Sequence, residues 1–299
     1  MTKLGFGVRF TQTCLRWQKK WGGHDKTDFS RRVFRILELR NEGHRLTLAA
    51  EARFESALGP LEITDWGEQG FSVKASACLS GRRRFDASFH NPGIVTIRRH
   101  LAKHGKGFTT VADAGYDVWV PGRYKRIPAK DGIVYRDSAN LLEVSPDLMK
   151  RFADCQFGDE FRGRVKSGWI LIPCSGQVYG IIGTAILATE ALDDQVVSNH
   201  VIRVAPREHA TIRAGYLVTA MSHLMWGRPL IKSLAFGSSV PEIDSKDLAD
   251  LEIVRLNPAE ESAIADLAEA AAMARAAADL LERDIAQDAG AIIERFMAG

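Results

Sequence analysis

The residues with the clearest capacity for chemistry are cations and aromatics that alternate within one stretch, residues 115–132 (GYDVWVPGRYKRIPAKDG). Cationic side chains bind phosphate groups, and aromatic rings pack against bases and their methyl groups. The Gly and Pro residues within the stretch predict a loop. This loop is a candidate surface for a polyanion, and it offers Tyr116, Trp119, Arg123, Tyr124, Lys125, Arg126 and Lys130.

A second set of polar residues accompanies three short apolar runs that are rich in β-branched residues. The runs are Trp169–Pro173, Val178–Leu187 and Val196–Val204, with Ser-Gly and Asp-Asp between them. Runs of this length that end at Gly, Asp or Ser predict strands joined by tight turns. A rigid sheet commonly positions functional loops. The alternative is that these strands form only the core of an α/β domain. The turns would present Ser175, Gln177, Tyr179, Gln195 and Ser198.

Two helical segments are predicted on either side of this domain. Apolar residues recur at helical spacing over residues 30–60, until Gly59-Pro60 ends the pattern. Asn41-Glu42-Gly43 interrupts the pattern, which leaves one helix or a broken pair. A second helix is predicted from Asn257-Pro258, because Asn is a favoured N-cap and Pro a favoured first helical residue. This helix would be roughly 50–60 Å long.

The apolar residues of the second helix alternate steps of three and four, which is typical of a coiled-coil seam. Alanines in the middle of the seam would let another helix approach closely. The candidate partners are the helix of residues 30–58 and another subunit. The predicted seam consists of Ile264, Leu267, Ala271, Ala274, Ala278, Leu281 and Ile285.

These elements predict an α/β (α+β) fold in which one mixed-sheet domain lies between an N-terminal helix and a long coiled-coil-type helix. The expected segments are a basic arm (1–29), a helical segment (30–60), the mixed-sheet domain (61–257) and the long helix (258–299). Within the domain we expect a strand and a turn over 61–80, helices over 94–104 and 213–226, and a closing strand over 248–256. Arg84 and Asp86 are expected to form a structural pair.

Charge is unevenly distributed, although the formal net charge is only +3. Residues 1–40 carry ten Lys/Arg against three Asp/Glu, and residues 81–136 carry twelve against four. Residues 258–299 carry three against nine. This pattern favours a polyanion on one surface and a different partner on another. The alternative is that the charged faces are solvated and offset one another.

The composition also indicates where in the cell the protein is located. The four cysteines include no CxxC pair, which supports neither a zinc site nor a disulfide framework. The first thirty residues lack the apolar core of a secretory leader, and no apolar run reaches about 18 residues. We therefore expect a reduced, cytoplasmic protein without a membrane partner.

The motifs of nucleotide-dependent enzymes are absent from the sequence. Asn91-Pro92 is followed by Gly93, so the Asn-Pro-Pro-aromatic motif of an amino-methyltransferase fails, and Gly5-Phe6-Gly7 is too short for a cofactor loop. A GxxxxGK[ST] phosphate loop is also missing, which argues against an ATP-driven motor.

Hydrolase motifs are equally incomplete. Asp147 combines with Asp244 and Lys246 into a nuclease-like set only across a gap of about a hundred residues. His100 and His104 lack the glutamate of HExxH, and Ser175 does not lie in GxSxG. We therefore expect no catalytic residue, no metal and no cofactor.

The order and spacing of the segments resemble a known family. AEARFESALGP ends the first helix, and RRRFDASFHNP, the basic loop, SGWILIPCSGQVYG, VVSNHVIRV and GYLVTAMSHLMWG follow. A Gly-Ser turn, an apolar strand and the long helix complete the series. Over about residues 45–297 the chain resembles the specificity subunit of type I restriction–modification systems.

The resemblance implies a target-recognition domain that reads one half of a two-part DNA sequence from the major groove. It also implies long helices that act as a spacer and dock methyltransferase subunits. Such subunits usually carry two recognition domains, whereas this chain has room for one. A half-size subunit that dimerises, or one part of a divided subunit, is then expected, with Ala271, Ala274 and Ala278 as the candidate dimer seam.

Under this resemblance the expected partners are double-stranded DNA, the methyltransferase and restriction subunits, and a second copy of the chain. Cations would hold phosphates, Arg can also pair with guanine, and Gln177 or Gln195 with adenine. The alternatives are a nucleic-acid hydrolase with an unrecognised metal site and a helical assembly protein. The expected DNA-binding residues are Arg123, Lys125, Arg126, Gln177, Tyr179, Gln195, Ser198, Arg228 and Lys232.

Overall fold

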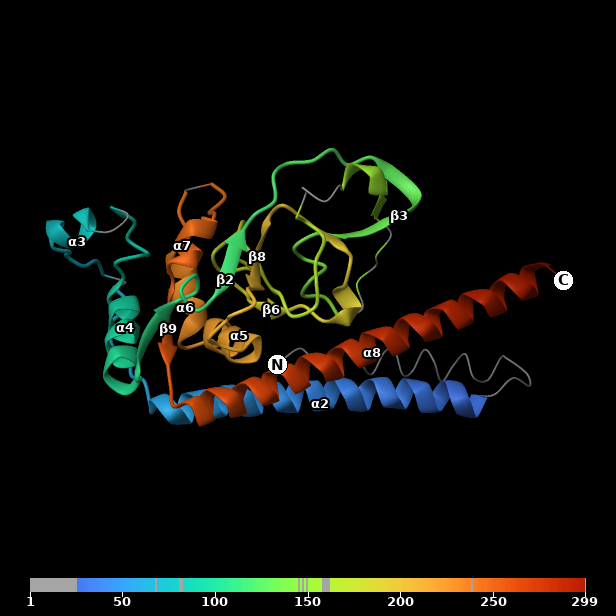
Figure 1. Ribbon diagram of the computed structural model, residues 1–299, viewed down its shortest axis with the longest axis horizontal. Coiled ribbons are helices and arrows are strands. Elements are labelled where there is room, and N and C mark those ends of the chain that lie inside the picture. The colour runs from blue at the N-terminus through green and yellow to red at the C-terminus, as the bar shows by residue number, and fades with distance from the viewer. Residues whose placement is uncertain are drawn as a thin grey trace.

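The computed structural model describes residues 26–298, apart from residues 68, 81, 82, 145, 147, 149, 158–161 and 238. Most of the expected basic arm and Asp147 therefore lie outside the described residues. The described part has a mixed α/β fold in which a pair of long helices runs beneath a domain of short strands and helices (Figure 1). The expected fold class is thus confirmed.

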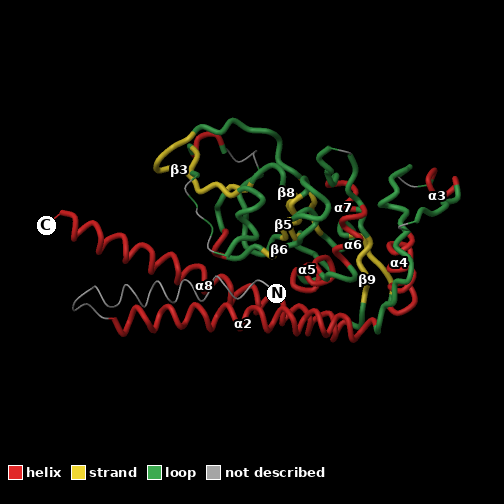
Figure 2. The backbone as a smooth tube through the Cα atoms, turned by 180° about the vertical axis from the view of Figure 1, so that it is seen from behind, coloured by secondary structure: helices red, strands yellow, loops and turns green. Residues whose placement is uncertain are grey.

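The long pair consists of α2 (Lys26–Leu58) and α8 (Pro258–Ala298). The two helices lie side by side in both views (Figures 1 and 2). α2 begins four residues before the position expected from the sequence and passes through Gly43 without a break, so the broken-pair alternative is wrong. A Cβ atom on Gly43 would lie 3.0 Å from Arg275 Cγ and 3.1 Å from the Ala271 carbonyl oxygen, so glycine permits a close approach of the helices there.

The seam of α8 is filled within the chain. Ala278 and Ile285 pack with Ile36 of α2, and Ala271 is also buried. Nearer its start, α8 packs on α5 (Ala214–Ser222), where a Cβ on Gly215 would lie 2.5 Å from the Ala265 carbonyl oxygen. The prediction that the long helix packs on the helix of residues 30–58 is therefore confirmed. Ala271 and Ala278 are buried within the chain, whereas Ala274 is half-buried, so the use of this seam between two copies stays a prediction.

Ion pairs connect α2 and α8 along their length, and their order shows that the helices are antiparallel. Arg53 pairs with Glu260 at 2.8 Å, and Arg32 pairs with Asp288 at 2.6 Å. Between them, Arg40 pairs with Asp279 at 3.1 Å and with Glu282. The basic N-terminal helix and the acidic C-terminal helix thus offset each other, as the alternative reading of the charge pattern proposed.

In the described part of the chain, the strands form a four-stranded, a three-stranded and a two-stranded sheet. The orders are β2-β8-β5-β6, β4-β3-β7 and β1-β9. β3 and β7 are parallel, and the other pairs are antiparallel. The strands are β1 (Gly107–Thr110), β2 (Tyr116–Trp119), β3 (Pro128–Arg136), β4 (Arg151–Phe152), β5 (Ile170–Pro173), β6 (Ile186–Leu187), β7 (Val196–Val197), β8 (Val201–Pro206) and β9 (Glu252–Arg255).

Several strands differ from the expectation. Residues 178–183 are turns and only β6 forms from that run, because Gly183 adopts a φ of +73° that ends extended structure. The run 196–204 divides into β7 and β8, which belong to different sheets. The described residues of 61–80 contain no strand, and the loop 115–132 contains β2 and the start of β3.

The shorter helices close the domain. α4 confirms the expected helix, and its Ile94, Ile97 and Leu101 are buried. The helix expected over 213–226 ends early as α5, and α6 follows it. The main core lies where α5 and α6 meet the four-stranded sheet. The remaining helices are α3 (Ala75–Leu79), α4 (Pro92–His104), α6 (Gly227–Ser233) and α7 (Ser245–Ala249), with 3₁₀ turns η1 (Asp154–Gln156) and η3 (Glu190–Leu192).

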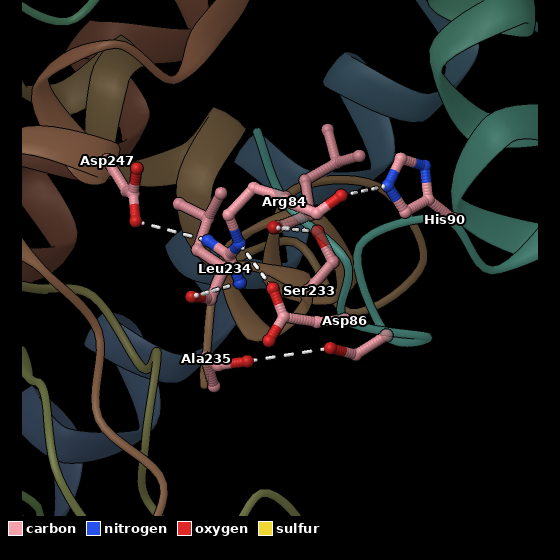
Figure 3. Close-up of polar contacts among 9 residues, drawn as sticks. Arg84, Asp86, His90, Ser233, Leu234, Ala235 and Asp247 are labelled. Carbon is pink, nitrogen blue, oxygen red and sulfur yellow. Dashed lines mark hydrogen bonds and ion pairs between the residues drawn. The ribbon is translucent and has the colours of Figure 1, made fainter. Parts of the chain in front are cut away.

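Arg84 ties residues 83–91 to the ends of α6 and α7 (Figure 3). Its guanidinium donates to Asp86 at 2.5 Å, to Asp247 at 3.1 Å and to the Leu234 carbonyl oxygen at 3.1 Å. The expected Arg84–Asp86 pair is therefore confirmed, and Asp247 extends it across the domain.

None of the helices in the described ranges has both the length and the apolar character of a membrane span.

The buried seam predicts different outcomes for neighbouring alanines of α8. Ala278 is fully buried against α2, whereas Ala277 is exposed. Ala278→Leu should overpack the helix pair and destabilise the protein by about 1–3 kcal/mol. Ala277→Leu, the matched control, should change the free energy of unfolding little. Urea unfolding monitored by circular dichroism measures both, and equal effects would contradict this packing.

The buried His223 predicts a pH dependence of stability. It packs on Phe54 and Trp226, and its Nδ1 accepts from the Met225 N–H at 3.3 Å. Burial lowers the pKa of His223, against a smaller raising effect of Glu55. The unfolded chain therefore binds a proton that the folded chain resists, so the free energy of unfolding falls as the pH falls below about 6.5.

His223→Gln should reduce this acid destabilisation, because glutamine does not titrate. Urea midpoints at about pH 7.5 and about pH 5.5 bracket the transition. The exposed His209→Gln is the control and should keep the wild-type difference between the two midpoints. An identical difference in His223→Gln would rule out this cause.

Candidate nucleic-acid interface

The register of the four-stranded sheet brings separate segments to one edge. Trp119 at the end of β2 lies opposite Arg203, and Pro173 at the end of β5 lies opposite Val201 at the start of β8. The residues after β2, after β5 and before β8 therefore emerge together. We call this edge the rim, which comprises residues 120–127, 174–183 and 198–200.

The rim lies on the side of the domain remote from the helix pair. Both views show the connection from β2 to β3 arching over the sheet, with α2 and α8 on the opposite side (Figures 1 and 2). The chain thus presents two separate surfaces, one on the sheet edge and one on the helices.

Side chains link the three rim segments. Arg126 Nη2 donates to Asn199 Oδ1 at 3.4 Å, and Ser175 Oγ shares a hydrogen bond of 2.9 Å with His200 Nδ1. The Cys174 N–H donates to the His200 carbonyl oxygen at 3.0 Å. Between the rim and the three-stranded sheet lies an open hollow of about 430 Å³, lined by Arg126, Tyr135, Asp137, Ser138, Lys150, Phe152, Ser175, Ser198 and His200.

The cations expected to bind phosphate lie on the first rim segment. Arg123, Lys125 and Arg126 are exposed. The Arg126 guanidinium also lies 5.3 Å from the centre of the Tyr135 ring, which restrains it at the mouth of the hollow. These three side chains therefore form an exposed cationic set.

Gln177 and Tyr179 are exposed on the second rim segment. A turn forms there, in which the Gly180 N–H donates to the Gln177 carbonyl oxygen at 2.8 Å. Tyr179 is 87% exposed, which is unusual for so large an aromatic side chain. The turn therefore projects an aromatic ring and a side-chain amide beyond the sheet.

Arg228 and Lys232 support this turn from α6. Arg228 Nη2 donates to the Gly180 carbonyl oxygen at 3.1 Å, and Lys232 lies beside Gly183. Both side chains are half-buried, and burial followed by the charge of Arg228 lowers the pKa of Lys232. Arg228 thus holds the loop in place, whereas the sequence predicted a direct DNA contact.

Among the predicted DNA-binding residues, Gln195 departs most clearly from its expected position at the surface. Its side chain is buried, its Oε1 accepts from Arg136 Nε at 2.6 Å, and its Nε2 donates to the Ala191 carbonyl oxygen at 2.9 Å. The amide is occupied inside the fold, which contradicts a base contact. Ser198 is also buried, although it lines the hollow, and its Oγ accepts from the His200 N–H at 3.2 Å.

Sequence reasoning missed Asn199, His200 and Lys150. Asn199 and His200 were hidden inside an apolar run that was interpreted as one strand, yet Ser-Asn-His is itself a turn signal. Lys150 faces the hollow while pairing with Asp137 at 3.0 Å, a contact that no local pattern indicates.

The residues considered for enzymatic chemistry have structural partners. His100 stacks on His104 with ring centres 4.2 Å apart, and its Nε2 lies 2.9 Å from the Leu58 carbonyl oxygen. Asp244 caps α7 by accepting from the Lys246 N–H at 2.8 Å. Among the described residues, no three His, Cys, Asp or Glu side chains gather as metal ligands.

Comparisons with known proteins give only distant matches. No protein-family model matches the chain, and neither does any curated protein. Among solved structures it is similar to the type I restriction–modification system S subunit from M. genitalium, with 17% identity over 54% of this chain and a TM-score of 0.38. It is also similar to the HsdS subunit from Thermoanaerobacter tengcongensis, with 12% identity over 64% of this chain and a TM-score of 0.38. The chain covers 37% and 50% of those two proteins, respectively.

Proposed function

We propose that this protein is the DNA-binding specificity subunit of a type I restriction–modification complex. In this role the mixed-sheet domain of residues 61–257 reads a half-site, and partner subunits carry out methylation and cleavage in the cytoplasm. The observation that carries the proposal is the rim, where exposed Arg123, Lys125, Arg126, Gln177 and Tyr179 meet at one sheet edge. The order of sequence segments that resembles the family supports the same function.

The rim offers two kinds of contact that a DNA reader needs. Arg123, Lys125 and Arg126 suit phosphates, which fix the register of a protein on the duplex. Gln177 and Tyr179 are exposed on the turn after β5, and a glutamine amide can pair bidentately with adenine in the major groove. One rim segment would thus supply phosphate contacts, and another would supply contacts to base edges.

The helix pair offers the second surface, for the methyltransferase subunit. Its outward side exposes apolar residues, including Phe34 (62% exposed) and Met273 (64% exposed). Leu280 is exposed seven residues after Met273, and Leu48 fourteen residues after Phe34, so each pair lies along one face of its helix. Apolar faces of this kind suit a permanent protein partner.

One recognition domain per chain fits a half-size subunit or one part of a divided subunit. A second copy could use these exposed helix faces, because Ala271 and Ala278 of the alanine seam are buried within the chain.

The proposal predicts a salt-dependent affinity that resides in the rim. Arg123→Gln/Arg126→Gln should weaken binding to a labelled mixed-sequence duplex and lower the slope of log affinity against log salt by roughly two, about one per lost phosphate contact. Fluorescence anisotropy at several salt concentrations measures both. Arg31→Gln/Arg45→Gln removes the same charge from exposed positions of α2 and should leave the slope unchanged. Equal slopes for both variants would refute the assigned face.

Sequence reading is tested by selection of duplexes from a randomised library with the purified full-length chain. We expect enrichment of one short motif, and Gln177→Ala/Tyr179→Ala should relax it, because each good base contact contributes about 1–3 kcal/mol of discrimination. A library that remains random would contradict the proposal. Magnesium-dependent cleavage of the duplex by the chain alone would instead favour the hydrolase alternative.

A further inference from the structure

Arg203 is a charged side chain buried completely beneath the rim. It belongs to β8 and has an exposed fraction of 0%. Its guanidinium donates to main-chain carbonyl oxygens: Nη1 to Ser198 at 2.8 Å and Val201 at 2.5 Å, and Nη2 to Val197 and to Gly163 at 3.3 Å.

This arrangement is expensive for the fold, because a buried charge is normally paired with a carboxylate. Among the described residues, the hydrogen bonds of Arg203 go to carbonyl oxygens and to no carboxylate. Burial lowers the pKa of Arg203 to about 10, which still leaves it charged at neutral pH. The carbonyl contacts are therefore what the side chain contributes, since an aliphatic residue would fill the space without the desolvation.

Three of the four carbonyl partners surround one turn. Val197 ends β7, Ser198 begins the turn and Val201 begins β8. The hydrogen bonds from Arg203, which we call the clamp, therefore span the point where the chain leaves the three-stranded sheet for the four-stranded one. The Ser198 N–H also donates to the Arg136 carbonyl oxygen at 2.9 Å. An apolar run that would otherwise continue as one strand is thus held as a turn.

The turn presents two side chains to the outside of the rim. Asn199 accepts from Arg126, and His200 is exposed with its Nδ1 engaged by Ser175. With Nδ1 engaged in this way, the His200 ring has its Nε2 side available for a ligand atom at the hollow. Both residues are polar and adjoin the cationic segment.

We propose that the turn Ser198–His200 contacts DNA and that Arg203 is its positioning residue, which never touches DNA itself. The inference rests on the proposed function and deepens it by adding Asn199 and His200 to the interface. The clamp affects DNA binding through the shape of the turn, because the turn keeps that shape only while the Arg203 guanidinium bonds the carbonyl groups of the turn.

A double-mutant cycle tests this, with the full-length chain and a labelled mixed-sequence duplex at low salt. His200→Ala and Arg203→Met should each weaken binding by roughly tenfold, the value of about one hydrogen bond. The double variant should also lose about tenfold rather than a hundredfold, because both changes remove the same contact. Arg203→Lys keeps the positive charge but lacks the planar, forked set of donors that a guanidinium provides. Its affinity for the duplex should therefore lie between those of Arg203→Met and wild type.

Matched variants separate positioning from a general loss of stability. Arg84→Met removes another half-buried arginine of the domain, one that bonds Asp86, Asp247 and the Leu234 carbonyl oxygen far from the turn, and should lower the melting temperature without changing affinity. Arg203→Met combined with Arg123→Gln should weaken binding multiplicatively, because Arg123 lies on a different segment. If circular dichroism shows that Arg203→Met does not fold, Ser175→Ala takes its place in the cycle. Ser175→Ala removes the hydrogen bond that orients the His200 ring, so adding it to His200→Ala should weaken DNA binding no further than His200→Ala alone.

Multiplicative losses for His200→Ala with Arg203→Met or with Ser175→Ala would overturn the inference, as would wild-type affinity in folded Arg203→Met. Such results would leave the proposed function intact, because the wild-type chain would still bind. Absence of duplex binding by the wild type would overturn the proposed function, and this inference with it.

Discussion

The register of β8 is the constraint on which the rest of the domain depends. Alternate residues of this central strand face two different environments: Ile202 and Val204 enter the main core, whereas Val201 and Arg203 face the three-stranded sheet. A shift by one residue would exchange the faces and place a guanidinium among aliphatic side chains. The carbonyl contacts of Arg203 therefore fix the strand, and the strand fixes which segments emerge at the rim.

Much of the architecture follows from local pattern, and the exceptions have identifiable physical causes. The long helix from Pro258, its seam and the buried face of α4 were predictable, because helical periodicity is strong and glycine is rare there. The division of residues 196–204 was missed, because the Ser-Asn-His turn signal stands inside a β-branched run, and the bonds from Arg203 to carbonyl oxygens that hold the turn leave no mark in the residue pattern. Gln195 was misassigned for a related reason: its partner Arg136 lies 59 residues away. The rim cations were correctly predicted to be exposed, since a Gly- and Pro-containing loop rarely enters a core.

Charge has two different uses in this molecule. On the helix pair, basic residues of α2 meet acidic residues of α8 and largely offset them. At the rim, Arg123 and Lys125 remain exposed, and Arg203 and Arg228 point their guanidinium groups at carbonyl oxygens, which carry no net charge to offset them. The nearly balanced total charge therefore conceals a locally positive sheet edge.

The pairing of α2 with α8 also has a consequence for biosynthesis. The contact between Arg53 and Glu260 spans 207 residues, so α2 leaves the ribosome long before its partner exists. At roughly 5–20 residues per second, the interval is about 10–40 s. Throughout it, the apolar stripe of α2 that includes Ile36 has no cover. Late pairing of the two helices, after synthesis of the domain between them, is the folding order that such a topology imposes.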